Sequence, residues 1–138
     1  MQKIESGEKE DAVLLFEKGI KNSSPYVSKL CSLFLSEINK KKAVEIIESA
    51  LKKDPEDNAL NCRYMAVLYE TGKYETLIDF SEQKKDLLGK DNEYIKYRLL
   101  ALAKTGNDSF ATEFINWFSE PKFTTYHREF LEDWYKDS

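Results

Sequence analysis

The residues that most often catalyse reactions or bind metals are scarce in this sequence of 138 residues. It contains one histidine, His127, and two cysteines, Cys31 and Cys62, which lie 31 positions apart. A zinc site takes about four ligands at short spacings, so we predict no metal site. No nucleophile motif accompanies His127, which lies beside Tyr126 and one turn before Phe130. We therefore expect His127 to be a partly buried packing residue rather than a catalytic base.

Other signs of enzyme chemistry are weak. The 5 glycines are scattered singly, so the sequence has no glycine-rich loop of the kind that cradles phosphates. Carboxylates are abundant, but lysines are interspersed with them on helix faces that we expect to be solvated. Two of these carboxylates would form a general acid–base pair only by chance. We predict that the protein is not an enzyme and uses no cofactor.

Composition and net charge limit the kinds of partner, such as nucleic acids or membranes, that the protein is expected to bind. The chain is 41% apolar, which is enough for a core, and its net charge of −4 argues against nucleic-acid binding. The densest basic run, Lys40–Lys42, is expected to be a solvated helix start. Two cysteines are too few for a disulfide scaffold, so we expect buried free thiols and a cytoplasmic location. The start, Met1–Glu5, has no secretory apolar core. No apolar run approaches the ~20 residues of a membrane span, so we expect no membrane partner.

Prolines and glycines divide the chain into helices, and no stretch shows the alternation of a half-buried strand. We predict an all-α protein. Gly7 is expected to end a first helix, Ser24 to cap a helix that has Pro25 at its first position, and Gly72 and Gly106 to end two more. The predicted helices run over residues 8–21, 25–37, 40–53, 59–70, 74–88, 92–105, 108–120 and 122–136.

The helices recur with a fixed period. Gly72 and Gly106 lie 34 residues apart, and Ala43, Leu77 and Ala111 follow one another at the same interval. A period of about 34 residues in helix–turn–helix units is that of the tetratricopeptide repeat.

Residue types at matching positions carry this resemblance. On the first helix of each pair, a medium-sized residue is followed one turn later by a large apolar one. The turn Gly72-Lys73-Tyr74 has the aromatic residue that follows the turn glycine in this family. Pro55 and Pro121 stand where a repeat ends. Small residues stand at helix crossings, although Leu77, Lys84 and Phe118 depart from the pattern. The chain resembles a degenerate tetratricopeptide array over essentially its whole length. The matching positions are Cys31, Met65, Leu99 and Leu131, then Phe34, Leu68, Leu102 and Trp134, then Ala12, Gly19, Ala43, Ala50 and Ala111.

The resemblance implies a right-handed α-α superhelix of about three to three and a half repeats in a single domain, residues 1–138. Residues 1–24 would be a partial repeat, and 25–56, 57–91 and 92–121 would be repeats. Residues 122–138 would be a capping helix with a polar back. The start, without such a cap, is expected to be either the remainder of an excised or appended segment or a short helix that packs alone.

In this family the first helices of successive repeats line a concave groove, so the resemblance implies a scaffold or adaptor that binds a peptide or partner helix. Tyr69, Tyr97 and Arg128 are the expected anchors. A carboxylate clamp like that of chaperone-binding relatives is not expected, because only Lys96 fits it. The alternatives are an accessory domain of a larger enzyme or peptide-responsive regulator, and a small secretion chaperone. The predicted groove residues are Ser28, Ser32, Leu35, Cys62, Ala66, Tyr69, Glu70, Lys96, Tyr97, Leu100, Lys104, Arg128, Glu132 and Tyr135.

Overall fold

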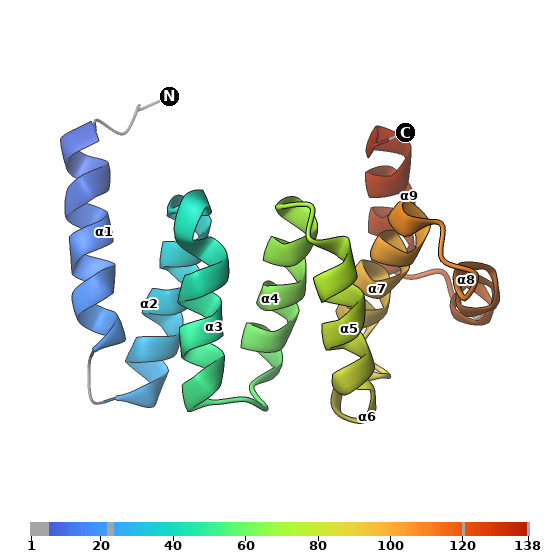
Figure 1. The fold of residues 1–138 in the computed structure, drawn as a ribbon, viewed down its shortest axis with the longest axis horizontal. Coiled ribbons are helices and arrows are strands. Elements are labelled where there is room, and N and C mark those ends of the chain that lie inside the picture. Colours follow the sequence, from blue (N-terminus) through green and yellow to red (C-terminus); the bar gives the residue numbers. More distant parts are fainter. Residues whose placement is uncertain (1–5, 22–23, 120, 138) are drawn as a thin grey trace. The chain divides into compact units, whose positions relative to one another are not determined.

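The computed structural model describes residues 6–21, 24–119 and 121–137, and within these ranges the protein is all-helical, without a strand (Figure 1). The predicted all-α class is therefore confirmed. The chain divides into two compact units, Met1–Tyr64 and Met65–Ser138. The boundary between them falls inside one continuous helix, α4 (Asn58–Glu70). The predicted repeat boundaries stay a prediction.

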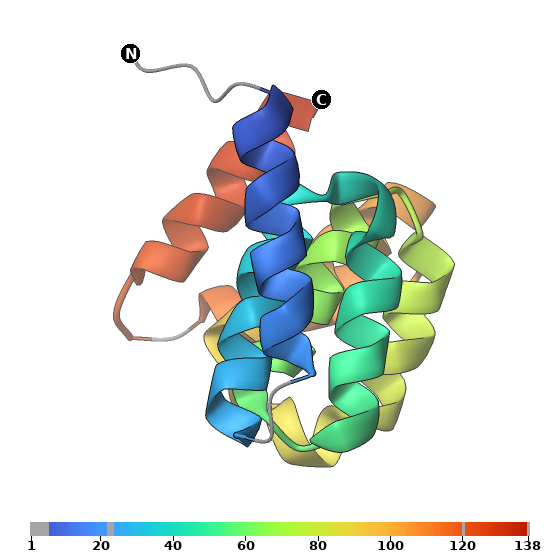
Figure 2. The same ribbon diagram turned by 90° about the vertical axis from the view of Figure 1, so that its left-hand side faces the viewer.

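The first unit contains α1 (Ser6–Ile20), α2 (Pro25–Ile38), the short 3-10 helix η1 (Lys40–Lys42), α3 (Ala43–Lys53) and the start of α4. Helix α2 packs against both α1 and α3. Figure 2 looks at this unit from the side of α1, which lies in front of α2. The predicted cap is confirmed, because the Ser24 hydroxyl accepts a hydrogen bond from the Val27 N–H and Pro25 is the first helical residue.

The second unit contains the remainder of α4, then α5 (Tyr74–Gln83), α6 (Lys85–Leu88), α7 (Asn92–Thr105), α8 (Phe110–Phe118) and α9 (Thr125–Asp137). Helix α7 packs against α5, α8 and α9 and so is central to this unit. Gly72 and Gly106 have φ of 76° and 64°, a left-handed conformation that costs glycine little. Both predicted turn glycines are confirmed.

Three predicted helix boundaries are wrong. Gly7 lies inside α1 rather than at the end of an earlier helix. The helix predicted over residues 74–88 breaks at Lys84, whose φ of −100° and ψ of 8° leave the α-helical range and separate α5 from α6. The last helix begins at Thr125 rather than Lys122, because the Thr124 side chain caps it by accepting from the His127 N–H at 3.2 Å. Residues 1–5 of the predicted first helix lie outside the described residues.

The buried face of α2 differs from the predicted one. Ser28, Ser32 and Leu35, predicted to line the binding groove, are buried, whereas the apolar Val27 and Phe34 are 36% and 51% exposed. Each buried serine hydroxyl donates to a backbone carbonyl: Ser28 to Ile20 at 2.7 Å and Ser32 to Ser28 at 3.0 Å. A satisfied hydroxyl removes most of the cost of burial, so small serines can face the neighbouring helix.

The small residues predicted at helix crossings behave in two ways. A Cβ added to Gly19 would lie 2.1 Å from the Cys31 Sγ, which confirms the close approach of α1 to α2. Ala43 and Ala50 are buried, at 1% and 8% exposure. Ala111 is exposed, so its assignment to a crossing is wrong.

An aromatic cluster holds α8 and α9 together. Phe130 is fully buried and lies against Phe110, Phe114 and Trp117, with ring centroids 5.9–6.5 Å apart. Trp134 completes the cluster, 4.9 Å from Phe110, yet it remains 37% exposed. Arg128 and Glu132 of the predicted polar back are exposed, but several apolar side chains of this helix are exposed as well: Tyr126, Leu131, Trp134 and Tyr135.

Candidate partner-binding groove

Four of the predicted binding residues converge on one groove in the second unit. Tyr69 and Glu70 come from the last turn of α4, and Tyr97 and Lys104 come from α7. The groove has a volume of about 480 Å³. Tyr74 of α5 and Asp133 and Lys136 of α9 complete its lining. We call these seven residues the tyrosine groove.

Three tyrosines form the aromatic part of this groove. The ring of Tyr69 lies between the other two, 5.6 Å from Tyr74 and 6.1 Å from Tyr97, measured between centroids. Both pairs are tilted, which is a favourable arrangement of ring quadrupoles. Because Tyr69 is the last aromatic of α4 and Tyr74 begins α5, the left-handed Gly72 turn brings them together.

Burial, together with nearby carboxylates, keeps the Tyr97 hydroxyl neutral. Burial raises the pKa of the Tyr97 phenol above its ordinary value of 10.0. Lys96 lowers this pKa, while the carboxylates of Glu93, Glu70 and Asp133 raise it. The hydroxyl is therefore a hydrogen-bond donor and acceptor at neutral pH rather than a phenolate.

Lys96 is buried against the Tyr97 ring and does not line the groove. Its side chain is 8% exposed, its Nζ lies 3.1 Å from the Glu129 Oε1, and the same atom lies 4.5 Å from the centroid of the Tyr97 ring. Burial opposes the charge of Lys96, but Tyr97, Glu129 and Asp133 together raise its pKa above 10.5. The ammonium is thus charged and already paired, so it is not available to clamp a ligand carboxylate.

Seven of the predicted binding residues are buried in this structure. Their exposure is 8% or less, so each presents little surface to a partner. The serines and Leu35 face neighbouring helices of the first unit for the reasons given above. The seven are Ser28, Ser32, Leu35, Cys62, Ala66, Lys96 and Leu100.

The predicted residues of α9 are out of phase by one position. Arg128 and Glu132 are exposed at 65% and 68% and pair with each other at 3.8 Å, and Tyr135 is 85% exposed. The groove is lined instead by Asp133 and Lys136. One residue turns a helix by about 100°, so a shift of one moves a side chain to another face.

The groove residues that the prediction missed, on α5 and on α9, each had a signal in the sequence. Tyr74 is the aromatic that follows the turn glycine Gly72. Among the described side chains of α9, His127 and Phe130 are the buried ones. Asp133 lies three residues beyond Phe130, on the same side of the helix. Taking these two as the inward pair would have set the correct phase.

The lone histidine packs against aromatic rings. His127 is 1% exposed, and its ring lies 4.4 Å from that of Trp117 and 4.7 Å from that of Phe118. Its Nδ1 accepts from the Thr124 N–H at 3.0 Å, which leaves Nε2 to donate to the Trp117 carbonyl at 3.1 Å. The predicted packing role is confirmed, with more complete burial than expected.

Within the ranges that the structure covers, no three His, Cys, Asp or Glu side chains gather as metal ligands would. Both cysteines are free thiols, Cys62 buried and Cys31 partly buried. None of the helices in the described ranges has the length and apolarity needed to cross a membrane.

Comparisons with known proteins give no relative for this chain. No protein-family model matches it, and neither a curated protein nor a solved structure does.

Proposed function

We propose that this protein is a non-enzymatic interaction module that binds an extended peptide segment of a partner protein in the tyrosine groove. The observation that carries this proposal is the convergence of Tyr69, Tyr74 and Tyr97 with side chains of both charges on one hollow surface. Tyrosine offers a large apolar area with a polar end and loses little conformational entropy on binding.

The chemistry of the groove favours a peptide over an apolar ligand. Glu70 and Asp133 can pair with basic side chains of the peptide, and Lys104 and Lys136 with acidic ones. The neutral Tyr97 hydroxyl can bond to a peptide carbonyl or N–H. A volume of about 480 Å³ accommodates a few side chains rather than a folded domain.

We also propose that the helices are tetratricopeptide-like pairs in a right-handed superhelix. The pairs would be α2 with α3, α4 with α5, and α7 with α8. The 34-residue spacing of Gly72 and Gly106 and their matching left-handed turns support this assignment. So does the packing of α7 against α5, α8 and α9, because the first helix of a repeat contacts its own partner and its neighbours.

A selection from a displayed random-peptide library tests the function. Enriched peptides would be labelled and titrated against the wild type and a groove variant, Lys104→Glu with Lys136→Glu, whose two positions are exposed. For enriched peptides with acidic side chains we expect the dissociation constant to rise about tenfold or more, or about 1.4 kcal/mol, because the two lysines that would pair with them are reversed.

A charge-matched variant controls for the loss of positive charge. Lys85→Glu with Lys90→Glu changes two exposed lysines outside the groove, and it should bind the same peptides as the wild type does. Failure to enrich any peptide, or equal weakening by both variants, would contradict the proposal.

A further inference from the structure

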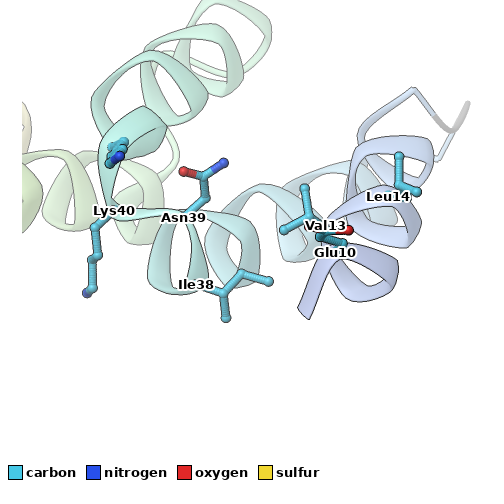
Figure 3. Close-up of a pocket in the computed structure, with 7 residues that line it drawn as sticks. Glu10, Val13, Leu14, Ile38, Asn39 and Lys40 are labelled. Atoms are coloured by element: carbon cyan, nitrogen blue, oxygen red, sulfur yellow. The ribbon is translucent and has the colours of Figure 1, made fainter. Parts of the chain in front are cut away.

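A second hollow surface lies on the first unit, along α1. Its first part, of about 630 Å³, is lined by α1 on one side and by the end of α2 with η1 on the other. In Figure 3, Glu10, Val13 and Leu14 lie on α1, across from Ile38, Asn39 and Lys40. A second pocket of about 440 Å³ shares Leu14 and continues along α1 toward α3. We call the two adjoining pockets the α1 groove.

The floor of the α1 groove is apolar. Val13, Leu14 and Ile38 line its first pocket, and Ile20, Leu35 and Ile46 line the second together with Leu14. Leu14 is 56% exposed and its neighbour Leu15 is 67% exposed. Large apolar side chains left open beside a groove are typical of a surface that a partner covers.

The rim of the α1 groove is basic. Lys40 and Lys41 stand at one end and Lys18 and Lys21 at the other, against the carboxylates of Glu10 and Glu17. Lys40, Lys41 and the adjacent Lys42 are all exposed. Among the residues that the structure describes, none forms an ion pair with these three lysines. An apolar floor with an unpaired basic rim fits an amphipathic helix that carries acidic residues.

This chain itself has such a helix, α9. Leu131, Trp134 and Tyr135 are exposed along it at 43%, 37% and 85%, and Glu132 beside them is 68% exposed. Residues 125–137 contain four acidic and two basic side chains and so have a net charge of −2.

The lengths of the helix and the groove also agree. The 13 residues of α9 span about 20 Å at 1.5 Å per residue. The groove-lining part of α1, from Glu10 to Ile20, spans about 17 Å by the same measure.

We propose that α9 of a second copy of this chain docks in the α1 groove. Leu131 and Tyr135 would occupy the apolar floor, and Glu132 would lie against the lysines of η1. The two faces are different surfaces, so the contact is head-to-tail and leaves a free groove at one end of each complex and a free α9 at the other. Copies therefore add to one another head to tail.

The docked helix would leave the tyrosine groove accessible. Asp133 lies about 160–200° around α9 from Leu131 and Tyr135, so it faces another side of the helix. The inference does not depend on the peptide-binding proposal, and either can fail alone.

Sedimentation velocity over a wide concentration range tests the inference on the full chain. We expect the average mass of the wild type to pass beyond that of a dimer as concentration rises, and to fall again when salt is added. A groove variant, Lys40→Glu with Lys41→Glu, and a helix variant, Leu131→Lys with Tyr135→Lys, should each associate at least about tenfold more weakly. The altered side chains are exposed, and circular dichroism would verify that both variants remain folded.

Mixing the two variants makes the test specific. Each retains one intact surface, so we expect the mixture to form a dimer that grows no further. Lys85→Glu with Lys90→Glu, the charge-matched control, should associate like the wild type. A wild type that stays monomeric at every concentration would overturn the inference, even if an unrelated acidic amphipathic peptide bound the groove. So would association that neither variant weakens, or a mixture that stays monomeric.

Discussion

At the scale of single residues, two alanines at equivalent repeat positions have different surroundings. Ala43 is 1% exposed at the start of α3, where α3 packs against α2, whereas Ala111 is exposed on α8. An alanine at the same repeat position therefore lies at a tight helix crossing in Ala43 and on a solvated helix face in Ala111.

Substitution by leucine should separate these two positions. Ala43→Leu overpacks a buried crossing and should lower the free energy of unfolding by about 1–3 kcal/mol. Ala111→Leu adds methylenes to an exposed face and should change it by less than about 0.5 kcal/mol. Chemical denaturation of both variants measures the difference. An equal loss of unfolding free energy in both variants would contradict the exposed position of Ala111.

Asp57 carries the clearest pH-dependent contribution. One carboxylate oxygen accepts from the Leu60 N–H at 3.0 Å and so caps α4, and the other lies 3.0 Å from the Lys29 Nζ. Burial alone would raise the pKa of this carboxyl. The bonds from the Leu60 and Ala59 backbone and the charge of Lys29 outweigh burial and lower the pKa below 3.8.

The sign of the pH effect follows from that lowered pKa. The stabilisation by Asp57 is present above the unfolded pKa of 3.8 and is lost as pH falls through the lower pKa of the folded state. Asp57→Asn keeps a capping oxygen but not the charge, so we expect it to cost about 1–2 kcal/mol at neutral pH.

Denaturation of both proteins across a pH series measures this difference. The two stabilities should converge at acidic pH, below the folded pKa of Asp57. The exposed carboxylate of Asp54 provides the control, and Asp54→Asn should cost less than about 0.5 kcal/mol at neutral pH. A stability difference that does not shrink in acid would contradict the assignment.

At the scale of elements, one side of α9 is buried and the other is exposed. Phe130 and His127 anchor it among the rings of α8, while Leu131 and Tyr135 are exposed. An apolar periodicity alone does not distinguish these sides, because both carry large apolar residues at helical spacing.

Truncating the two large aromatics of α9 should give unequal losses. Phe130→Ala removes a fully buried ring and should lower the free energy of unfolding by about 3–5 kcal/mol. Trp134→Ala should cost less, because 37% of that residue is exposed although it touches Phe110 and Phe114. Thermal and urea denaturation of both variants provide the measurement. A greater loss from Trp134→Ala would reverse the assignment of the buried side.

At the scale of the whole molecule, α4 is shared by the two compact units. The boundary lies between Tyr64 and Met65, and an α-helix bonds each N–H to the carbonyl four residues earlier. Helix formation is cooperative, so we expect the two halves of α4 to unfold together.

We expect the chain to unfold in a single cooperative transition for this reason. Both tryptophans, Trp117 and Trp134, belong to the second unit, so their fluorescence reports that unit alone. Far-ultraviolet circular dichroism reports the helices of both. The two urea transitions should coincide. A dichroism transition at lower urea than the fluorescence transition would show that the first unit unfolds alone.

The sequence by itself determined the helical class and most helix ends. Proline, a serine cap and left-handed glycine act on the backbone within a few residues, so Pro25, Ser24, Gly72 and Gly106 could be interpreted without knowing the fold. The convergence of Tyr69 and Tyr97 was also within reach, because the resemblance to tetratricopeptide repeats assigned both to first helices that would line one groove.

Only the tertiary structure decided which face of each helix is buried. A helix such as α2 or α9 has apolar residues on more than one side, and its neighbours select the side that packs. That choice buried Ser28 and Ser32, exposed Phe34, and turned Asp133 rather than Glu132 toward the tyrosine groove. Local spacing does not contain this information, because the rotation of a helix about its axis is set by contacts with residues distant in the chain.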